Sequence, residues 1–404
     1  MSIQFHYNNL DDSFVGIKNI ENSFHIYFPR GFSSDDAYTR KDVLSLLHIL
    51  KRKSLSNKVS ISSKENGFPL ESYLYIIRDF LKNGYFQVKD TQKCNETRGK
   101  INWKDTIRKH KPHIVDNGFF FSTFVVEKKI SHQNSLISLI YKKCLSEAVS
   151  KIGFLFGNIQ NPPMEQRVTI TEAISVTSKI LQRSFSDEKK TLFQHILNIL
   201  KSIGNSETGK ANETLFGTDT FAPVWEYLVD RKFGDKDLQK EYHPRAEWHL
   251  LENSSYTTPA PLRLDSIHIN GDIAYILDSK YYKYGVTLRT EDLPGTESVA
   301  KQIIYGDEVK KRHKGELKKI YNAFIIPADN GIETPYKYLG YATSTWKNSD
   351  DEDFHNSVWL ISVDSRFLLY NYDNNSVQEK QDLMDLIKGR ADNILSINFG
   401  QRRT

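Results

Sequence analysis

Residues 262–280 read LRLDSIHINGDIAYILDSK and decide the fold of the C-terminal part of the chain. Two apolar runs flank Asn270-Gly271, a dipeptide that is the strongest short-range signal for a β-hairpin with a two-residue turn. Both faces of this hairpin are apolar. Strands that are apolar on both faces are typical of a sheet buried on both sides, so we expect helices to cover it.

Three charged side chains interrupt one face of the hairpin. Pairing counted outward from the predicted turn sets Asp265 opposite Ile276, and the alternation of side chains then makes Asp265 and Asp278 diagonal neighbours on that face. Lys280 lies further along the same face. Two carboxylates and an ammonium on an apolar face are costly unless something compensates them. A divalent cation is an obvious candidate, because hard cations prefer oxygen ligands and a bound metal generates hydroxide for hydrolysis.

The composition is that of a soluble globular protein, with 404 residues of which 39% are hydrophobic and 26% charged. A chain of this length predicts more than one domain. The net charge of +5 and the sequence pI near 8.8 permit a polyanion partner without requiring one. Cys94 and Cys144 form no closely spaced pair, which is typical of reduced thiols in a cytosolic protein. The start of the sequence has no features of a signal peptide, and no apolar run approaches the ~18 residues of a membrane helix, so we expect a cytoplasmic protein with no membrane partner.

Periodicity predicts an α/β protein in two parts. Helical spacing marks residues 40–52, 69–82, 134–155, 168–183 and 191–203, and strands are predicted within 13–30 and at 119–126. The polar stretch 204–213 is interpreted as a linker. After it we expect a helix at 221–232, a strand at 246–251, the hairpin, a helix at 297–311, strands at 321–327, 336–342 and 358–363, and a helix at 377–390. This order predicts a mixed α+β region at 1–212, for partner docking, DNA binding or both, and a domain at 213–404 with a mixed sheet flanked by helices.

The pattern of Asp265, Asp278 and Lys280 resembles the active site of the PD-(D/E)xK, or restriction-endonuclease-like, nucleases. The resemblance implies that Asp265 and Asp278 hold Mg²⁺, for which Mn²⁺ can substitute. It also implies that Lys280 contacts the attacking water and screens the charge that develops on the phosphate. Ser279 is a candidate to add its backbone carbonyl to the metal. The family's usual proline before the first aspartate is Leu264 here. The alternative interpretation is a surface hairpin that carries ordinary charges.

Three further residues extend the predicted site. Glu226 lies on the helix predicted at 221–232, on the shoulder of its buried stripe. Many PD-(D/E)xK nucleases have a glutamate on the helix before the sheet that reaches the metal. Gln302 and Tyr305 resemble the Q-x-x-x-Y motif of some members, with a spacing one residue short. The alternatives are a solvated glutamate, a surface amide and a packing tyrosine.

Basic residues gather in two segments of the sequence. One group is Lys310, Lys311, Arg312 and Lys314, and the other is Lys104, Arg108 and Lys109. Contact with DNA phosphates is the functional interpretation of both groups. A solvated protein face is the alternative.

Two motifs resemble binding sites but fail on inspection. Residues 204–211, GNSETGKA, nearly match the phosphate-binding loop of nucleotide-binding proteins. They end in alanine, which lacks the magnesium-binding hydroxyl, and they follow a helical segment, so we expect this chain itself to bind no nucleotide. His243 and His249, together with Glu247, could suggest a zinc site. No third soft ligand stands near the two histidines, so they are interpreted as structural or DNA-facing.

Three segments together narrow the interpretation. They are GKINWKDTI at 99–107, LFGT at 215–218 with VWE at 224–226, and the Asp265, Asp278 and Lys280 pattern. The chain resembles restriction endonucleases of the LlaJI family, which are related to McrC, the nuclease subunit of McrBC-type systems. The resemblance implies cleavage of double-stranded DNA in a bacterial restriction system with a cognate DNA methyltransferase. It also implies an McrB-like AAA+ GTPase as partner, docked through the N-terminal part of this chain. This sequence holds no motor motif of its own, which agrees with a separate motor.

Two other functions stay open on the sequence alone. The chain could be a non-catalytic DNA-binding or partner-activating subunit with a vestigial site, which metal binding compared with an Asp265/Asp278 double alanine variant would decide. It could also be a self-sufficient type II endonuclease whose N-terminal half reads its own DNA site. Cleavage without GTP or partner would decide for that function.

Overall fold

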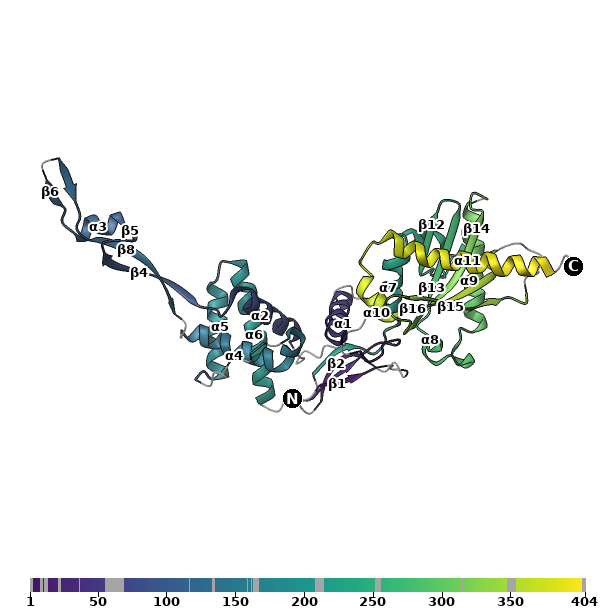
Figure 1. Cartoon of the computed structure of the whole chain (residues 1–404), viewed down its shortest axis with the longest axis horizontal. Coiled ribbons are helices and arrows are strands. Elements are labelled where there is room, and N and C mark those ends of the chain that lie inside the picture. The colour runs from purple at the N-terminus through teal and green to yellow at the C-terminus, as the bar shows by residue number, and fades with distance from the viewer. Residues whose placement is uncertain are drawn as a thin grey trace. The chain divides into compact units, whose positions relative to one another are not determined.

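The computed structural model describes residues 3–401 apart from 8–9, 11–13, 21–22, 36, 55–68, 116, 133–134, 158, 161, 163–166, 208–213, 251–255, 314 and 347–353. It divides into two compact units (Figure 1). Unit 1 comprises Met1–Lys64 together with Leu215–Thr404, and unit 2 comprises Glu65–Thr214. Unit 2 is therefore inserted between two stretches of unit 1. Sequence reasoning grouped residues 1–212 into one region, whereas the structure groups the first 64 residues with the C-terminal part.

A five-stranded mixed sheet forms the centre of unit 1, in the order β12-β13-β14-β16-β15 (Figure 1). Its strands are β12 (Ser266–Asn270), β13 (Ile273–Ser279), β14 (Lys319–Ala328), β15 (Tyr336–Thr343) and β16 (Ser357–Asp364). β13, β14 and β16 run parallel, while β12 and β15 are antiparallel edge strands. β14 and β16 are buried along nearly their whole length, as near-continuous apolar strands are in a sheet covered on both faces.

The hairpin of β12 and β13 turns one residue later than predicted. Asn270 pairs with Ile273, so Gly271 and Asp272 occupy the turn. Gly271 has a φ of +60°, which glycine adopts without steric cost and which the first central position of a type II′ turn requires. The turn is therefore of the Gly-X kind and not the Asn-Gly kind that the sequence predicted.

This turn shifts the pairing of the hairpin by two residues. Ser266 pairs with Leu277, so Asp265 comes next along the chain opposite Asp278 and not opposite Ile276. A shift by an even number of residues keeps every side chain on its face of the sheet. The predicted shared face of the two aspartates is therefore confirmed, and the predicted diagonal relation is corrected to a direct one.

Helices cover both faces of the sheet, as predicted. The helices of unit 1 are α1 (Thr39–Ser54), α7 (Ala222–Phe233), α8 (Tyr284–Thr287), α9 (Thr296–His313), α10 (Ser365–Asn371) and α11 (Val377–Gln401). α9 packs through Val309 on the face that carries Ile276. The opposite face carries Tyr321, whose hydroxyl donates to Asp392 of α11 at 2.9 Å. α7 lies on that same face, where its residue Asp230 accepts from the Ser266 hydroxyl of β12.

A second sheet of unit 1 has the order β1-β3-β2-β9. Its strands are β1 (Ile3–His6), β2 (Val15–Ile20), β3 (Ser23–Tyr27) and β9 (Thr214–Thr218). A Cβ on Gly16 of β2 would lie 2.2 Å from Phe216 O, and one on Gly217 of β9 would lie 2.4 Å from Val15 O. Only glycine fits at either position, so the strand that follows unit 2 is held tightly against a strand that precedes it.

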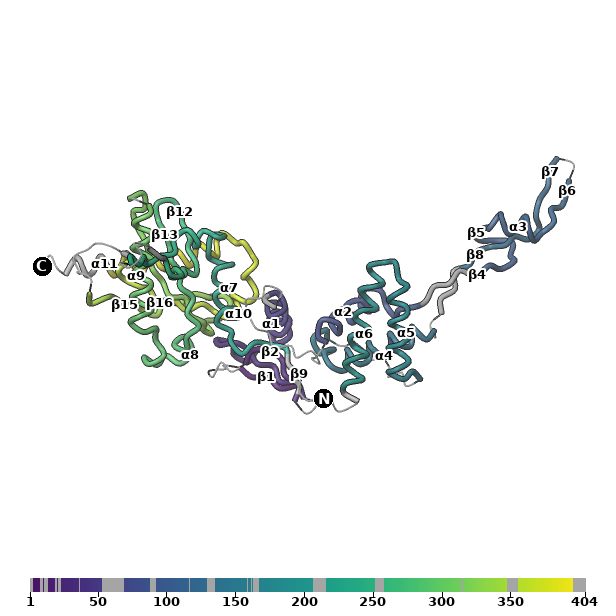
Figure 2. Tube along the Cα trace, turned by 180° about the vertical axis from the view of Figure 1, so that it is seen from behind, coloured from purple at the N-terminus to yellow at the C-terminus, as the bar shows by residue number. Residues whose placement is uncertain are grey.

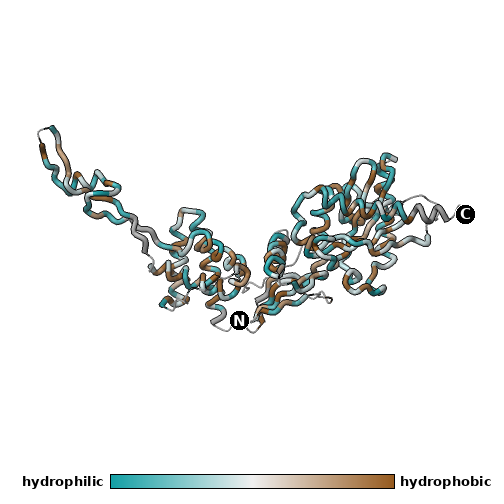
Figure 3. Tube along the Cα trace, viewed as in Figure 1, coloured by the Kyte–Doolittle hydropathy of each residue, from teal (hydrophilic) through white to brown (hydrophobic). Residues whose placement is uncertain are grey.

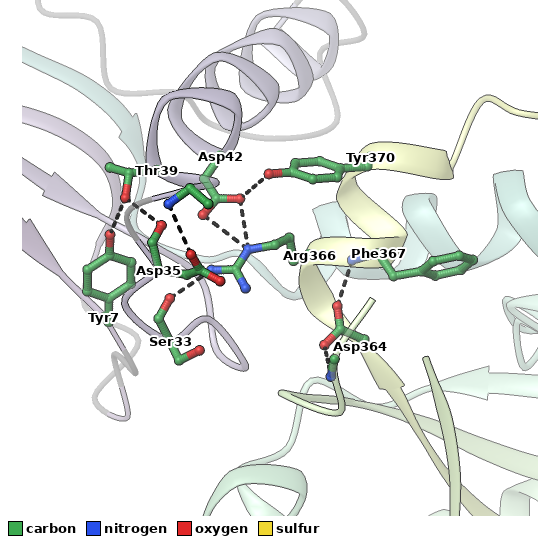
Figure 4. Close-up of polar contacts among 11 residues, drawn as sticks. Tyr7, Ser33, Asp35, Thr39, Asp42, Asp364, Arg366, Phe367 and Tyr370 are labelled. Carbon is green, nitrogen blue, oxygen red and sulfur yellow. Dashed lines mark hydrogen bonds and ion pairs between the residues drawn. The ribbon is translucent and has the colours of Figure 1, made fainter. Parts of the chain in front are cut away.

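A buried ion pair fastens α1 to the C-terminal part of unit 1 (Figure 4). Asp42 of α1 accepts from Arg366 Nε of α10 at 3.0 Å, and the two residues are 0% and 5% exposed. The Tyr370 hydroxyl also donates to Asp42, and Arg366 Nη2 donates to Ser33 O at 2.7 Å. Asp364 caps the first turn of α10 by accepting a backbone N–H at 2.7 Å. These contacts explain why the first residues of the chain belong to unit 1.

Unit 2 contains a group of packed helices. They are α2 (Leu70–Asn83), α4 (Leu136–Ile152), α5 (Ile170–Arg183) and α6 (Asp187–Glu207). α6 packs against both α2 and α5 (Figure 2). The helical spacing predicted at 69–82 agrees with α2, in which Leu70, Tyr73, Ile76 and Ile77 are buried. The helical part of unit 2 thus follows from its amphipathic periodicity.

The rest of unit 2 is a long antiparallel ribbon. Its elements are β4 (Val88–Glu96), β5 (Lys100–Ile101), α3 (Trp103–Lys109), β6 (His113–Val115), β7 (Gly118–Phe120) and β8 (Phe124–His132). Asn102 caps α3 by accepting from Asp105 N at 3.0 Å and donates to Glu127 at 2.9 Å, so the asparagine of the GKINW segment has a structural role. Apolar residues lie along the β6–β7 hairpin (Figure 3), where Ile114 and Phe119 are 85% and 68% exposed.

The α/β class with mixed sheets flanked by helices is confirmed, and most predicted elements are found within a few residues of their predicted ends. The strand predicted at 119–126 is split into β7 and β8, and the strand predicted at 246–251 is the short β10 (Trp248–His249). The predicted linker begins inside α6, and its residues 208–213 lie outside the described part of the chain. Among the described residues, no helix combines the length and apolarity that crossing a membrane requires.

Candidate active site

Asp265 and Asp278 meet at the end of β13. Asp278 is 6% exposed, and Asp265 directly precedes β12. The Oδ2 atom of Asp265 accepts from Ser279 N at 2.9 Å, which fixes the orientation of its carboxylate. Burial, the adjacent Asp278 carboxylate and the charge of Glu226 raise the pKa of Asp265 far above its usual range. Two carboxylates held this close in a buried position form a place where a cation is strongly favoured.

Lys280 lies directly beside this pair. Its Nζ is 2.8 Å from Asp278 Oδ2, and its side chain is 22% exposed. The Lys280 N–H donates to Ile325 O at 2.9 Å, which extends the pairing of β13 with β14 to the lysine itself. Burial opposes the charged ammonium, but Asp278 and Asp265 outweigh it and raise the pKa of Lys280 above its usual value. The structure therefore brings the three predicted residues together, with a charged ammonium at the rim.

Glu226 lies at an exposed position of α7. The buried stripe predicted beside it is found at Phe221, Val224, Trp225 and Leu228. The Glu226 charge is near enough to contribute to the raised pKa of Asp265. The part of Glu226 in metal binding stays a prediction.

Gln302 and Tyr305 are both buried on α9. Gln302 Nε2 donates to Ile276 O at 2.9 Å, two residues before Asp278 along β13, so Gln302 is not the surface amide of the alternative interpretation. The Tyr305 hydroxyl donates to Arg263 O at 2.7 Å, two residues before Asp265. Both side chains thus hold the backbone that carries the aspartates, and a catalytic role for Gln302 stays a prediction.

The donor set at this position fits a hard divalent cation. Within the described ranges, no three His, Cys, Asp or Glu side chains lie close enough together to enclose a metal ion. Mg²⁺ does not need such a cage, because it keeps several waters and binds through one or two carboxylates together with substrate phosphates. Asp265 and Asp278 supply two such groups, and a cation between them would relieve the repulsion that raises the pKa of Asp265. The pair offers neither thiolate nor imidazole, which disfavours zinc.

The predicted basic residues lie in different units. Lys310, Lys311 and Arg312 are exposed in the last turn of α9, and Lys314 lies outside the described residues. Lys104, Arg108 and Lys109 are exposed on α3 of unit 2. Arg312 pairs with Glu308 at 2.5 Å and Arg108 with Asp105 at 3.5 Å, so both arginines also have local structural partners. DNA contact by either group stays a prediction.

Sequence reasoning missed Arg30, which follows β3 and contacts Tyr281, the residue after Lys280. Its backbone N–H donates to the Tyr281 hydroxyl at 2.8 Å. Its guanidinium donates to Tyr281 O and lies 4.7 Å from the centre of the Tyr281 ring. Because Tyr281 directly follows Lys280, Arg30 fixes the chain where it leaves the carboxylate pair. A contact across 251 positions leaves no local signal in the sequence.

The chain belongs to the LlaJI restriction endonuclease family, whose model matches residues 14–343. The family resemblance inferred from the sequence is thereby confirmed. One relative is the type II restriction enzyme BsuMI component YdjA of Bacillus subtilis (strain 168), which is 25% identical over 322 residues. The match covers 75% of this chain and 66% of that relative, a little under two thirds of its length.

Two solved structures from Thermococcus gammatolerans show weaker similarity. One contains McrB AAA+ hexamers with bound McrC, with a TM-score of 0.32 at 14% identity, covering 92% of this chain and 83% of that chain. The other is a cryo-EM structure of the McrBC complex, with a TM-score of 0.20 at 16% identity, covering 47% of this chain and 58% of that chain. Scores this low do not establish a shared fold.

Proposed function

We propose that this chain is the DNA-cleaving subunit of a bacterial restriction system, a Mg²⁺-dependent endonuclease with a PD-(D/E)xK site in a restriction-endonuclease-like domain. One observation carries the proposal. Asp265 and Asp278 meet at the end of the parallel strand β13, with Lys280 2.8 Å from Asp278, in a chain of a restriction endonuclease family. Carboxylates next to a lysine at such a place are suited to the hydrolysis of a phosphodiester.

Each residue of the site has a distinct task in this proposal. Asp265 and Asp278 would hold Mg²⁺, with Glu226 as a further candidate ligand. The bound ion would supply a Lewis acid and a water of lowered pKa. The Ser279 N–H keeps the Asp265 carboxylate in one orientation. The Lys280 ammonium, held against Asp278, positions the attacking water and stabilises the negative charge that develops on the phosphate.

The proposal includes partners that the family resemblance implies. The substrate is double-stranded DNA, and the system contains a cognate methyltransferase. An McrB-like AAA+ GTPase acts as a separate motor. In this chain residues 204–211 nearly match a phosphate-binding loop, but they end in Ala211 and so lack the magnesium-binding hydroxyl of serine or threonine. The absence of that hydroxyl agrees with a motor on another chain.

Plasmid cleavage with Mg²⁺ or Mn²⁺ tests the proposal. Wild type, Asp278→Asn and Asp272→Asn are compared, each alone and with the AAA+ GTPase encoded beside it plus GTP. Asp272 is the matched control, because it lies at the turn of the same hairpin and pairs with Lys318 at 2.7 Å, at the opposite end from the site. We expect Asp278→Asn to lose cleavage and Asp272→Asn to keep it.

Two outcomes would contradict the proposal. Full cleavage by Asp278→Asn would show that the carboxylate pair is not the active site. Absence of cleavage by the wild type under all of these conditions, together with absence of Mn²⁺ binding in calorimetry, would favour the non-catalytic subunit.

A further inference from the structure

Two neighbouring chain segments, residues 242–250 and 256–264, form a surface next to the carboxylate pair. Their outer parts pair as β10 (Trp248–His249) and β11 (Tyr256–Thr257). Closer to the site, Leu262 N donates to Pro244 O at 2.9 Å. The two segments therefore lead, side by side, to Asp265 at the start of β12.

This surface carries arginines and an exposed aromatic side chain. Arg245 lies on the first segment and Arg263 on the second, and both are exposed. Trp248 is 62% exposed. Burial, followed by the charges of Arg263, Arg245 and Arg312, lowers the pKa of nearby His243. Arg245 directly follows Pro244 and Arg263 directly follows Leu262, so the two arginines lie next to the hydrogen bond that joins the segments.

Hydrogen bonds attach this surface to the site. His243 Nδ1 accepts from Leu264 N at 3.2 Å, which gives this histidine a structural partner. Arg263 O accepts from the Tyr305 hydroxyl at 2.7 Å, and Tyr305 is near enough to Asp278 and Asp265 for their charges to raise its pKa beyond the effect of burial. Residues 263 and 264 immediately precede Asp265, so the arginines are held at a fixed place relative to the carboxylate pair.

We infer that Arg245 and Arg263 bind backbone phosphates of DNA beside the bond that is cut, and that Trp248 packs against the same strand. The inference rests on the proposed nuclease function and names the surface that holds its substrate. Guanidinium groups present a fork of donors that matches phosphate oxygens. An exposed indole next to them offers an apolar face to sugar and base, as in other surfaces that follow a nucleic acid strand. Glu247, the acidic residue between the arginine and the tryptophan, lies 3.9 Å from His249, which moderates its charge when that histidine is protonated.

Binding of a labelled duplex by the full chain tests this inference. All variants carry Asp278→Asn so that the DNA stays intact, and affinity is measured by fluorescence anisotropy as salt is varied. The test variant is Arg245→Ala/Arg263→Ala. The matched control is Lys236→Ala/Lys318→Ala, which removes the same charge from two exposed positions. Lys318 pairs with Asp272 of the hairpin turn, and Lys236 follows Asp235, which accepts from Ile269 N. A third variant, Arg245→Lys/Arg263→Lys, keeps the charge.

Loss of two phosphate contacts should lower the affinity for the duplex at least about tenfold at ~0.1 M salt. It should also reduce the steepness of the plot of log affinity against log salt concentration (the salt slope) by about 2. The control and the lysine variant should keep the wild-type slope. Unchanged affinity and slope in the Arg245→Ala/Arg263→Ala variant would overturn the inference, as would an equal loss in the control.

The proposed function is judged separately by cleavage with the unmodified protein. If the unmodified protein cuts DNA while the arginine variant binds normally, this surface is wrong and the nuclease assignment stands. If the unmodified protein does not bind DNA, does not cut it either alone or with the AAA+ GTPase plus GTP, and does not bind Mn²⁺ in calorimetry, both fail.

Discussion

Replacing Arg366 with methionine should destabilise unit 1 more than any change at an exposed ion pair. Arg366→Met keeps most of the side chain's apolar length but removes the cation that faces Asp42 across the contact between α10 and α1. Asp42 is 0% exposed, so water does not replace the lost partner. Ser33 O loses the donor that Arg366 supplies at 2.7 Å.

The structure sets the size of the effect. Removing one member of a buried ion pair costs about 3–5 kcal/mol, because it leaves an uncompensated buried charge. Burial already raises the pKa of Asp42, although the hydrogen bonds from Arg366 and Tyr370 oppose that rise. The carboxylate in the variant can therefore take up a proton, which places the expected loss near the lower end of the range, about 3 kcal/mol.

Urea unfolding of the full chain measures this loss. The intrinsic fluorescence of the buried Trp225 and Trp359 reports on unit 1. The control is Arg52→Met, which breaks the ion pair between Arg52 and Asp373. These two side chains are 38% and 47% exposed, so the variant should lose less than about 1 kcal/mol of unfolding free energy. Asp42→Leu combined with Arg366→Met should recover part of the loss, because no buried charge remains. A cost of Arg366→Met no larger than that of Arg52→Met would refute the reasoning.

Three further outcomes are expected. Lys280→Met should lower the single-turnover cleavage rate by about 10²–10³-fold, since it removes the cation beside the reacting phosphate, and a full rate would exclude that role. Arg30→Met should lower the same rate by about 10–100-fold without changing duplex affinity, because Arg30 acts through Tyr281 on the placement of the lysine; an unchanged rate would show that the contact only supports the fold. Burial tends to raise the pKa of Asp235, but hydrogen bonds, the largest of them from His268, hold it below its usual range. The stability that the Asp235 carboxylate adds to the folded state is therefore fully present above the unfolded pKa of about 4. It is lost as the pH falls toward the lower pKa of the folded state. Asp235→Asn should therefore lower the urea midpoint at neutral pH, and its difference from the wild type should narrow below about pH 4; a difference that stays constant with pH would contradict this.

The candidate site could be predicted from the sequence because of a simple property of strands. Side chains alternate with a period of two, so Asp265 and Asp278 share a face in the predicted register and also in the observed one. The turn itself was predicted incorrectly. Asn270, Gly271 and Asp272 can form either an Asn-Gly turn or a Gly-Asp turn, and local propensity does not separate the two.

The contacts that join the first residues of the chain to the C-terminal part of unit 1 could not be predicted from the periodicity of the sequence. Asp42 and Arg366 lie 324 positions apart, with all of unit 2 between them, and neither stands in a recognisable motif. Strand β4 was missed because its sequence VKDTQKCNE has almost no apolar alternation. Periodicity predicts elements that bury one side, and it fails for a ribbon strand whose sequence is polar on both sides.

The insertion of unit 2 has a consequence for how such chains can diversify. Both ends of the insert are joined to one body, and β9 completes the small sheet beside β2 through the contact between Gly16 and Gly217. No hydrogen bond between strands of the five-stranded sheet involves a residue of 65–214. Unit 2 can therefore be exchanged without changing the hydrogen bonds between the strands of that sheet. A counterpart of another length or surface would leave the contact between Gly16 and Gly217 and the positions of Asp265 and Asp278 unchanged.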